Sequence, residues 1–408
     1  MVSCTLLIAG ATEHVLKNAK YKFMKKRLPI LFSIIFSILL IYLAIYIHTF
    51  LNIEKNTLFK FNSVESLNFH KKYSNIFHHL RNLKKEDNLK FNEYLYSTIN
   101  EFQPGQKNIL FQGDATVQQL NDPFDNNFEA LEFVKNFTKK NNLGFINAGI
   151  SSFSPTLMKL QLETLKKDFY IKPNIIVAYI DQTDIGDENC RYKNKKIIKN
   201  NSIVSIKGDN YTGKQFDYER IYGESKIFLT EKSKLKKSYK ILNFRIKYNY
   251  IKFRNKNVEK FKRILKDGYK GRKLTKCFVP RIQSYLANST DDEIKYFKRT
   301  VTEYINYIDK DDNIEKLFFI TFPHKNHLPK FKGSNNIYNH NVSDIIEDLI
   351  KDNKKIFHLN FTKLIVKQEI PFKKENYIKN DPVSHLSSKY YRNTFIKDVI
   401  KYVFNNLN

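Results

Sequence analysis

The composition of this 408-residue chain excludes several classes of protein before any motif is considered. Hydrophobic residues make up 42% and charged residues 27%, which provides for a large core and excludes global disorder. Lys and Arg number 70 against 41 Asp and Glu, a formal net charge of +29. Three cysteines exclude a disulfide-dense miniprotein and a multi-cysteine zinc ribbon, and 12 glycines exclude a collagen-like chain. The length predicts two or three domains, at about 150 residues each.

An uncharged apolar segment lies near the N-terminus, from Leu28 to Leu51. Its 24 residues contain no Asp, Glu, Lys or Arg, and about 20 apolar residues are enough for a helix to cross a bilayer. A cleaved signal peptide is the alternative, but its apolar region would be about 7–15 residues long and would precede a small-residue cleavage site. The segment therefore predicts an uncleaved transmembrane helix over 28–51.

The charges on either side of this segment predict its orientation. Six basic residues precede it: Lys17, Lys20, Lys22, Lys25, Lys26 and Arg27. After the segment, the only basic residues before Glu65 are Lys55 and Lys60. The positive-inside rule then predicts a bacterial inner-membrane protein, with residues 1–27 in the cytoplasm and the main domain in the periplasm. Met24, which is followed by Lys-Lys-Arg, is an alternative start to Met1.

The exported part shows two kinds of pattern. Residues 52–107 are polar, and we expect a stalk there with an entry helix over 88–102. From residue 108, short apolar runs alternate with helical patterns, which predicts βαβ units and a parallel sheet covered by helices on both faces. The expected strands are 108–113, 144–149, 174–181, 316–322 and 356–361. The expected helices include one beginning at Ser154-Pro155, one opened by a Thr290–Glu293 capping box, 342–349 and 388–404.

A long basic insertion, about 186–289, interrupts this α/β domain of residues 108–408. Residues 191–276 hold 27 basic and 7 acidic residues, a balance of +20 against +9 for the rest of the chain. Lysines interleaved with aromatics can bind nucleic acid. Because export is predicted, anionic lipid headgroups or acidic glycans are the better-matched partners, and no nucleic acid is expected. Solvated lysine faces on amphipathic helices are the plainer alternative. Cys190 and Cys277 bracket the insertion and could pair or remain unpaired.

Polar residues follow each expected strand, and functional residues of open α/β sheets collect at the carboxyl ends of strands. The turns are Gly113-Asp114-Ala115-Thr116, Asn147 to Ser152 with Gly149, Asp181 to Asp184, Pro323 to His327, and Asp381 to His385. In this order they resemble the SGNH (GDSL-like) hydrolase family, with its Gly-Asp-Ser, Gly, Gly-x-Asn-Asp and Asp-x-x-His blocks. The resemblance covers roughly 108–190 and 300–408, and it implies a flavodoxin-like three-layer αβα domain.

The resemblance assigns a role to each matching residue. The nucleophile falls on Ala115, which has no nucleophilic atom, and His385 and Asp381 match the base and its orienter with one extra residue between them. The resemblance implies that Asp114, Ser152 and Thr183 shape the oxyanion hole, with the Gln182 amide as a substitute donor. The implied chemistry is acyl transfer through a Ser-His-Asp site. Loss of the nucleophile of such a site costs on the order of 10⁶ in turnover.

Each residue also has a structural interpretation. Asp114 could be a helix N-cap, Gly149 could serve a tight turn, Asp184 could cap a turn, and His385 could be a packing histidine. Asp181 and Asp187 are expected to be solvated acids. His324 and His327 are spaced i, i+3, and without a third ligand we expect a surface or substrate-contacting role, no metal and no cofactor.

The functional expectation follows from the anchor and the resemblance together. They imply a membrane-anchored, exported esterase or O-acyltransferase-type protein of cell-envelope carbohydrate, inactive unless another group replaces the missing serine. One alternative is a non-catalytic envelope protein that binds a glycan or a partner. Another is a basic binder of anionic surfaces through 191–276.

Overall fold

The computed structural model of the chain describes residues 29–52, 61–77, 98–100, 106–206, 218–267, 289–325, 341–381 and 384–407, apart from residues 31, 49, 62, 75, 368 and 370–372. They fall into two compact units, each of which is described by itself. One unit is Glu65–Phe216 with Asp267–Asn408, and the other is Met1–Val64 with Asp217–Lys266. The basic insertion is therefore divided between the two units.

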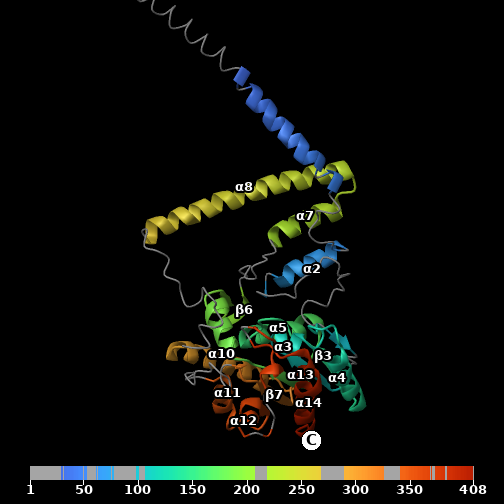
Figure 1. Ribbon diagram of the computed structural model, residues 1–408, viewed down its shortest axis with the longest axis vertical. Helices are drawn as coiled ribbons and strands as arrows, with labels where there is room; N and C mark the ends of the chain where they lie inside the picture. The colour runs from blue at the N-terminus through green and yellow to red at the C-terminus, as the bar shows by residue number, and fades with distance from the viewer. Residues whose placement is uncertain are drawn as a thin grey trace, which may run out of the picture. The chain divides into compact units, whose positions relative to one another are not determined.

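A six-stranded sheet forms the centre of the first unit (Figure 1). Its strands are β1 (Thr98–Asn100), β2 (Asn108–Gln112), β3 (Gly144–Asn147), β4 (Ile175–Tyr179), β7 (Lys316–Thr321) and β8 (Ile356–Asn360). Their order is β1-β3-β2-β4-β7-β8, and every neighbouring pair is parallel except β1 with β3. The five predicted strands and the α/β class are confirmed. The chain adds β3 on one side of β2 and β4 on the other, so the topological switch point lies between β2 and β4.

Strand β1 differs from the sequence prediction. Residues 98–100 fall within the entry helix expected over 88–102, but they pair antiparallel with β3, Ile99 opposite Ile146. Without β1, β3 would be an edge strand with unpaired backbone groups. Pairing of residues 98–100 satisfies the backbone groups on that edge, which stabilises a strand there more than the helical spacing of this polar segment stabilises a helix. Thr98 and Ile99 also favour a strand.

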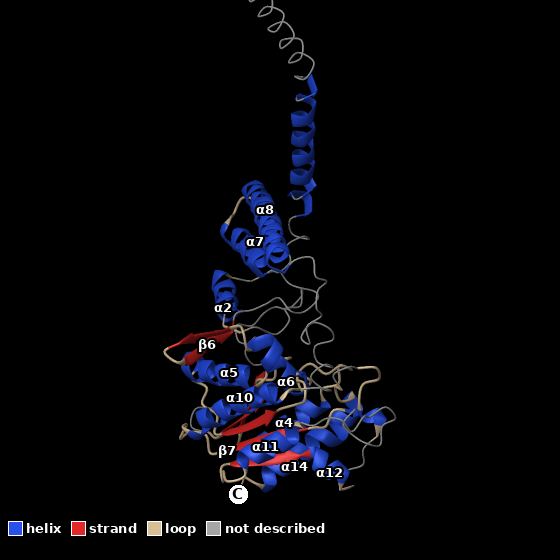
Figure 2. Cartoon of the chain, turned by 90° about the vertical axis from the view of Figure 1, so that its left-hand side faces the viewer, coloured by secondary structure: helices blue, strands red, loops and turns tan. Residues whose placement is uncertain are grey.

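Helices cover both faces of the sheet (Figure 2). On one face, alternate residues of the strands, such as Phe111 and Val177, share a core with α4 (Glu129–Lys140), the π-helical turn η4 (Tyr391–Phe395) and α14 (Ile396–Asn405). On the other lie α5 (Pro155–Phe169), α10 (Asp291–Asp309) and α11 (Val342–Ile350). The second face has a buried polar bridge, in which Gln112 at the end of β2 bonds Gln161 of α5 at 2.8 Å and the Tyr304 hydroxyl of α10 at 2.7 Å.

The predicted helix starts are largely confirmed. Thr290 and Glu293 form a capping box at the start of α10, and the apolar face of that helix is buried. Helix α5 begins at Pro155, as expected from Ser154-Pro155. The Ser154 hydroxyl, however, donates to the buried Glu188 carboxylate at 2.6 Å instead of capping the helix.

The first part of the insertion packs with the α/β unit. Helix α6 (Asp184–Gly186) continues into the π-helix η1 (Asp187–Tyr192), and a hairpin follows, with β5 (Lys196–Lys199) and β6 (Ser202–Ile206). Cys190 of η1 forms a disulfide; Cys277 lies outside the described residues.

Part of the expected stalk 52–107 also belongs to the α/β unit. Helix α2 (Val64–Ser74) contacts α5, because Lys72 Nζ and the Tyr73 hydroxyl both donate to the Asp168 carboxylate at 2.9 Å. The Ile206 N–H of β6 donates to the Ile76 carbonyl at 2.8 Å.

The second unit contains three helices in its described part. The helix Phe32–Asn52, 21 residues, is long and apolar enough to cross a membrane by length and composition. Helices α7 (Tyr218–Thr230) and α8 (Lys234–Asp267) form a hairpin in which the Glu224 carboxylate accepts from Arg245 Nε at 2.8 Å and pairs with its Nη2 at 2.7 Å.

Candidate active site

Asp381 and His385 form a directly bonded pair. His385 Nδ1 lies 2.8 Å from Asp381 Oδ2, and the backbone N–H of His385 donates to the same oxygen at 2.6 Å. Ser384 adopts a left-handed φ of +64°, which turns the chain back on itself just before His385. A carboxylate bound to Nδ1 fixes the tautomer and the ring orientation and leaves Nε2 for proton transfer. The residues predicted as base and orienter are therefore in direct contact.

Neighbouring segments position this pair. The Lys325 backbone N–H contacts Ser384 Oγ at 3.3 Å, and the Lys325 ammonium donates to the Asp381 carbonyl, which joins the loop after β7 to the Asp381–His385 turn. The Phe124 ring lies 5.7 Å from the His385 ring, centroid to centroid. Phe124 follows the helical turn α3 (Ala115–Gln118) by six residues, so the segment that begins at Ala115 borders His385.

The turn after β2 is held by its glycine and its aspartate. Gly113 has φ +147°, and a Cβ on it would lie 2.9 Å from the Tyr179 carbonyl oxygen. Asp114 is the N-cap of α3, and its Oδ1 accepts from the Thr116 N–H at 2.8 Å. Ala115 is the first residue of the helical turn, where a helix leaves N–H groups without intrahelical acceptors. Thr116 is buried and its side chain interacts with Tyr179, so its hydroxyl is engaged in the core.

Gly149 and Asn147 attach the loop after β3 to this turn. A Cβ on Gly149 would lie 2.5 Å from Gln118 N and 2.6 Å from Val117 C, so only glycine permits this approach. Asn147 Nδ2 donates to the Val117 carbonyl at 3.1 Å, and Asn147 Oδ1 accepts from Gly149 N–H at 2.9 Å. Gly149 therefore serves close packing between two strand ends and not merely a tight turn.

Ser152, to which the resemblance assigns the oxyanion-hole position, is held in a left-handed conformation. Its φ is +65°, and the buried Tyr192 hydroxyl of η1 donates to its carbonyl. The insertion therefore fixes the conformation of a residue at the site.

Acidic residues gather at the switch point. Burial, followed by the nearby Asp181 carboxylate, raises the pKa of Asp114 well above its ordinary range. The same two causes raise the pKa of Asp184, whose Oδ2 accepts from the Asp181 N–H at 3.1 Å. Asp181 Oδ1 accepts from both the N–H and the hydroxyl of Thr183, each at 2.6 Å. Thr183 Oγ1 is thus occupied locally, and Gln182 Oε1 accepts from Val342 N–H at 3.0 Å.

The structure contradicts one prediction about the remaining polar residues and shows the burial of two others. Asp187 is not solvated: it is buried and pairs with Arg191, Nε to Oδ1 at 3.0 Å. His324 is buried rather than on the surface. Asp181 is half-buried, so its expected contact with solvent is retained in part. His327 lies outside the described residues, and no group of three metal-ligating side chains occurs in the part of the chain that the structure describes.

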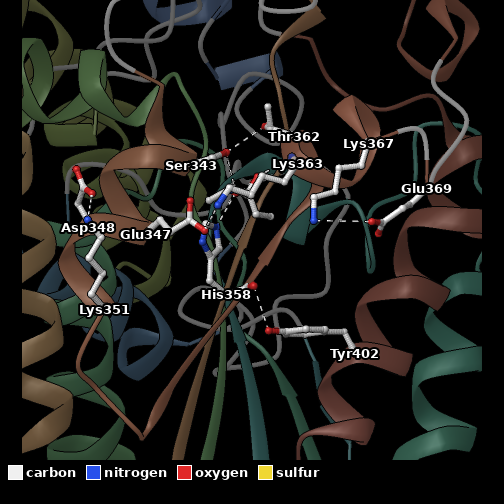
Figure 3. Close-up of polar contacts among 12 residues, drawn as sticks. Ser343, Glu347, Asp348, Lys351, His358, Thr362, Lys363, Lys367, Glu369 and Tyr402 are labelled. Atoms are coloured by element: carbon white, nitrogen blue, oxygen red, sulfur yellow. Dashed lines mark hydrogen bonds and ion pairs between the residues drawn. The ribbon is translucent and has the colours of Figure 1, made fainter.

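A second polar cluster lies between β7, β8 and α11 (Figure 3). His358 Nε2 lies 2.8 Å from Thr321 Oγ1, which accepts from Ser343 Oγ at 2.9 Å, and Ser343 Oγ lies 3.1 Å from Thr362 Oγ1. Burial lowers the pKa of His358 to about 4, so the imidazole is neutral at pH 7. Thr321 and Ser343 are 1% and 2% exposed. A substrate cannot reach these hydroxyls, and the cluster ties the edge strand to α11.

Sequence reasoning missed several residues that support the site. Lys325 and Phe124 contact the Asp381–His385 pair, and Tyr192 holds Ser152. Their partners are 40 or more residues away in the chain, so no local spacing could have indicated them.

No family model matches the chain, and no match was found among curated proteins.

Proposed function

We propose that the first unit is an SGNH hydrolase-like domain of the esterase or O-acyltransferase type for cell-envelope carbohydrate, in which Ala115 replaces the serine and prevents an acyl-enzyme. The observation that carries this proposal is the Asp381–His385 pair. The strand order supports it, because β3-β2-β4-β7-β8 is the flavodoxin-like order 2-1-3-4-5.

The arrangement supports ligand recognition and lacks one chemical step. His385 retains an orienting carboxylate, and the Ala115 and Ser152 positions each provide a backbone N–H suited to an ester carbonyl oxygen. The missing step is nucleophilic attack, since Ala115 offers a methyl group and the adjacent Thr116 is buried against Tyr179. The domain would therefore bind an acylated glycan without turning it over.

The anchor is part of the same proposal. The helix Phe32–Asn52 would hold the protein in the bacterial inner membrane, with its N-terminus in the cytoplasm and the α/β unit in the periplasm. Its support is the length and apolar composition of this helix and the six basic residues that precede residue 28.

A gain-of-function substitution tests the proposed site. The full-length chain with A115S should hydrolyse an activated acetyl ester well above the unaltered chain, and A115S/H385A should lose that gain. If A115S folds normally and hydrolyses no faster than the unaltered chain, the site is not an SGNH-type site.

Glycan binding by the unaltered chain is measured separately from hydrolysis. Binding of an acetylated glycan by the unaltered chain that persists in H385A would show that recognition does not use the base. Loss of binding in H385A would instead assign His385 to the ligand contact.

A further inference from the structure

Helix α8 has an unusual exposed face. Five large apolar side chains, here called the apolar stripe, are 48–69% exposed: Leu235, Tyr239, Ile246, Tyr250 and Phe253. At 3.6 residues per turn these positions fall within about 60° of arc. Surface helices of a monomer normally bury such a stripe, so the stripe needs an apolar partner.

Basic residues flank the stripe on one side. Each of four stripe residues is followed directly by a cation, and these four form the basic flank: Lys236, Lys240, Lys247 and Arg254. All four are exposed. Residues 232–258 contain ten basic and no acidic residues. An apolar stripe bordered by cations is the pattern of a helix that lies in the interface of a membrane.

The stripe is separate from the face that holds the hairpin together. Ile241 and Leu242 are buried, and Arg245 pairs with Glu224 of α7. A Cβ on Gly223 of α7 would lie 2.0 Å from the Phe244 ring, so the two helices approach closely. Because α7 packs against this face of α8, the apolar stripe stays exposed.

The same unit contains the apolar helix Phe32–Asn52, and α8 touches it. The Tyr42 hydroxyl donates to Asn243 Oδ1 at 3.0 Å, and Lys234 Nζ lies 5.0 Å from the centroid of the Phe50 ring. The first turns of α8 therefore lie beside a helix whose surface is apolar and uncovered. A bilayer that surrounds Phe32–Asn52 would be within reach of the stripe.

We propose that α8 is an interfacial helix whose apolar stripe enters a bilayer and whose basic flank binds anionic lipid headgroups. The two parts of the pattern match the two parts of an anionic membrane surface. The apolar stripe would contact the acyl chains, and the basic flank would bind the headgroup phosphates. An acidic glycan would satisfy the cations and leave the stripe in water. This inference goes beyond the proposed function and does not use position 115 or the Asp381–His385 pair.

The chain contains no tryptophan, which gives a clean optical test. F253W places a reporter on the stripe, and I251W places one on the same helix, about 160° away at 100° per residue. Both full-length variants are reconstituted in phosphatidylcholine vesicles with brominated acyl chains, with or without phosphatidylglycerol. F253W emission should fall about twofold or more in the anionic vesicles, because an interfacial helix buries its apolar face by about 5–10 Å. I251W should stay bright.

The charge variant K236Q/K247Q/R254Q, made in the F253W background, tests the headgroup contact. Lys240 is left unchanged because it pairs with Glu231. Each removed charge should weaken surface binding about fivefold, so the quenching should fall to its level without phosphatidylglycerol. Equal quenching of F253W and I251W would overturn the orientation. Quenching of F253W that ignores phosphatidylglycerol would overturn the anionic partner, and a bright F253W in every vesicle would overturn the proposal as a whole.

Discussion

Replacing Gly149 by alanine should destabilise the α/β unit by about 3 kcal/mol. The added Cβ would lie 2.5 Å from Gln118 N and 2.6 Å from Val117 C, and both are backbone atoms that cannot rotate away. Overpacking costs about 1–3 kcal/mol and occasionally more, and immobile backbone atoms place this case at the upper end. Such a loss is a large fraction of a typical total stability of about 5–15 kcal/mol.

The sign of the effect distinguishes two explanations. Gly149 does not have a left-handed φ, so without the close approach alanine would stabilise the fold by about 0.4–1 kcal/mol through the unfolded state. Urea denaturation of the full-length chain in detergent, followed by far-UV circular dichroism, measures the difference. K140A, on the exposed end of α4, is the matched control and should change stability by less than about 0.5 kcal/mol. A neutral or stabilising G149A would refute the close-approach argument.

Three further predictions concern buried groups of the same unit. Burial raises the pKa of Asp184, so above the unfolded pKa of about 3.9 the folded state binds more protons than the unfolded state, and stability should fall as the pH rises above that value. D184N should therefore show a smaller decline in urea midpoint between pH 5 and pH 8 than the unaltered chain, and equal declines would contradict this. E188A removes a buried carboxylate that accepts three hydrogen bonds and lies 3.8 Å from Lys196 Nζ, so it should cost about 3–5 kcal/mol in the same assay, and a cost no larger than that of K140A would contradict this. Non-reducing digestion and mass spectrometry should recover the Cys190 peptide linked to Cys277, and a free Cys190 thiol would contradict the disulfide.

The strands were predictable because burial on both faces makes them continuous apolar runs. Phe318 and Phe319 point to opposite faces of the sheet, yet both are fully buried. Strand β1 was not predictable in this way, since it has three residues and owes its place to the open edge of β3. A segment so short carries too little pattern to compete with the helical spacing around it.

The candidate site was predictable where it depends on local sequence. Asp381 and His385 are four residues apart and pair directly, and Asp114 caps the turn that follows its own strand. The expected solvation of Asp187 was wrong because η1, which holds both Asp187 and its partner Arg191, packs against α5 and α10, and that packing depends on the tertiary fold. The support given to the site by Lys325 depends on the tertiary fold alone.

Covalent trapping shows directly whether position 115 stands where a serine hydrolase has its nucleophile. The full-length A115S variant is treated with a fluorophosphonate probe, and the labelled peptide is located by mass spectrometry. We expect labelling of A115S at position 115, none in the unaltered chain, and loss of labelling in A115S/H385A. An A115S variant that folds normally but is unlabelled, or is labelled only elsewhere, would contradict the assignment of position 115 to the nucleophile.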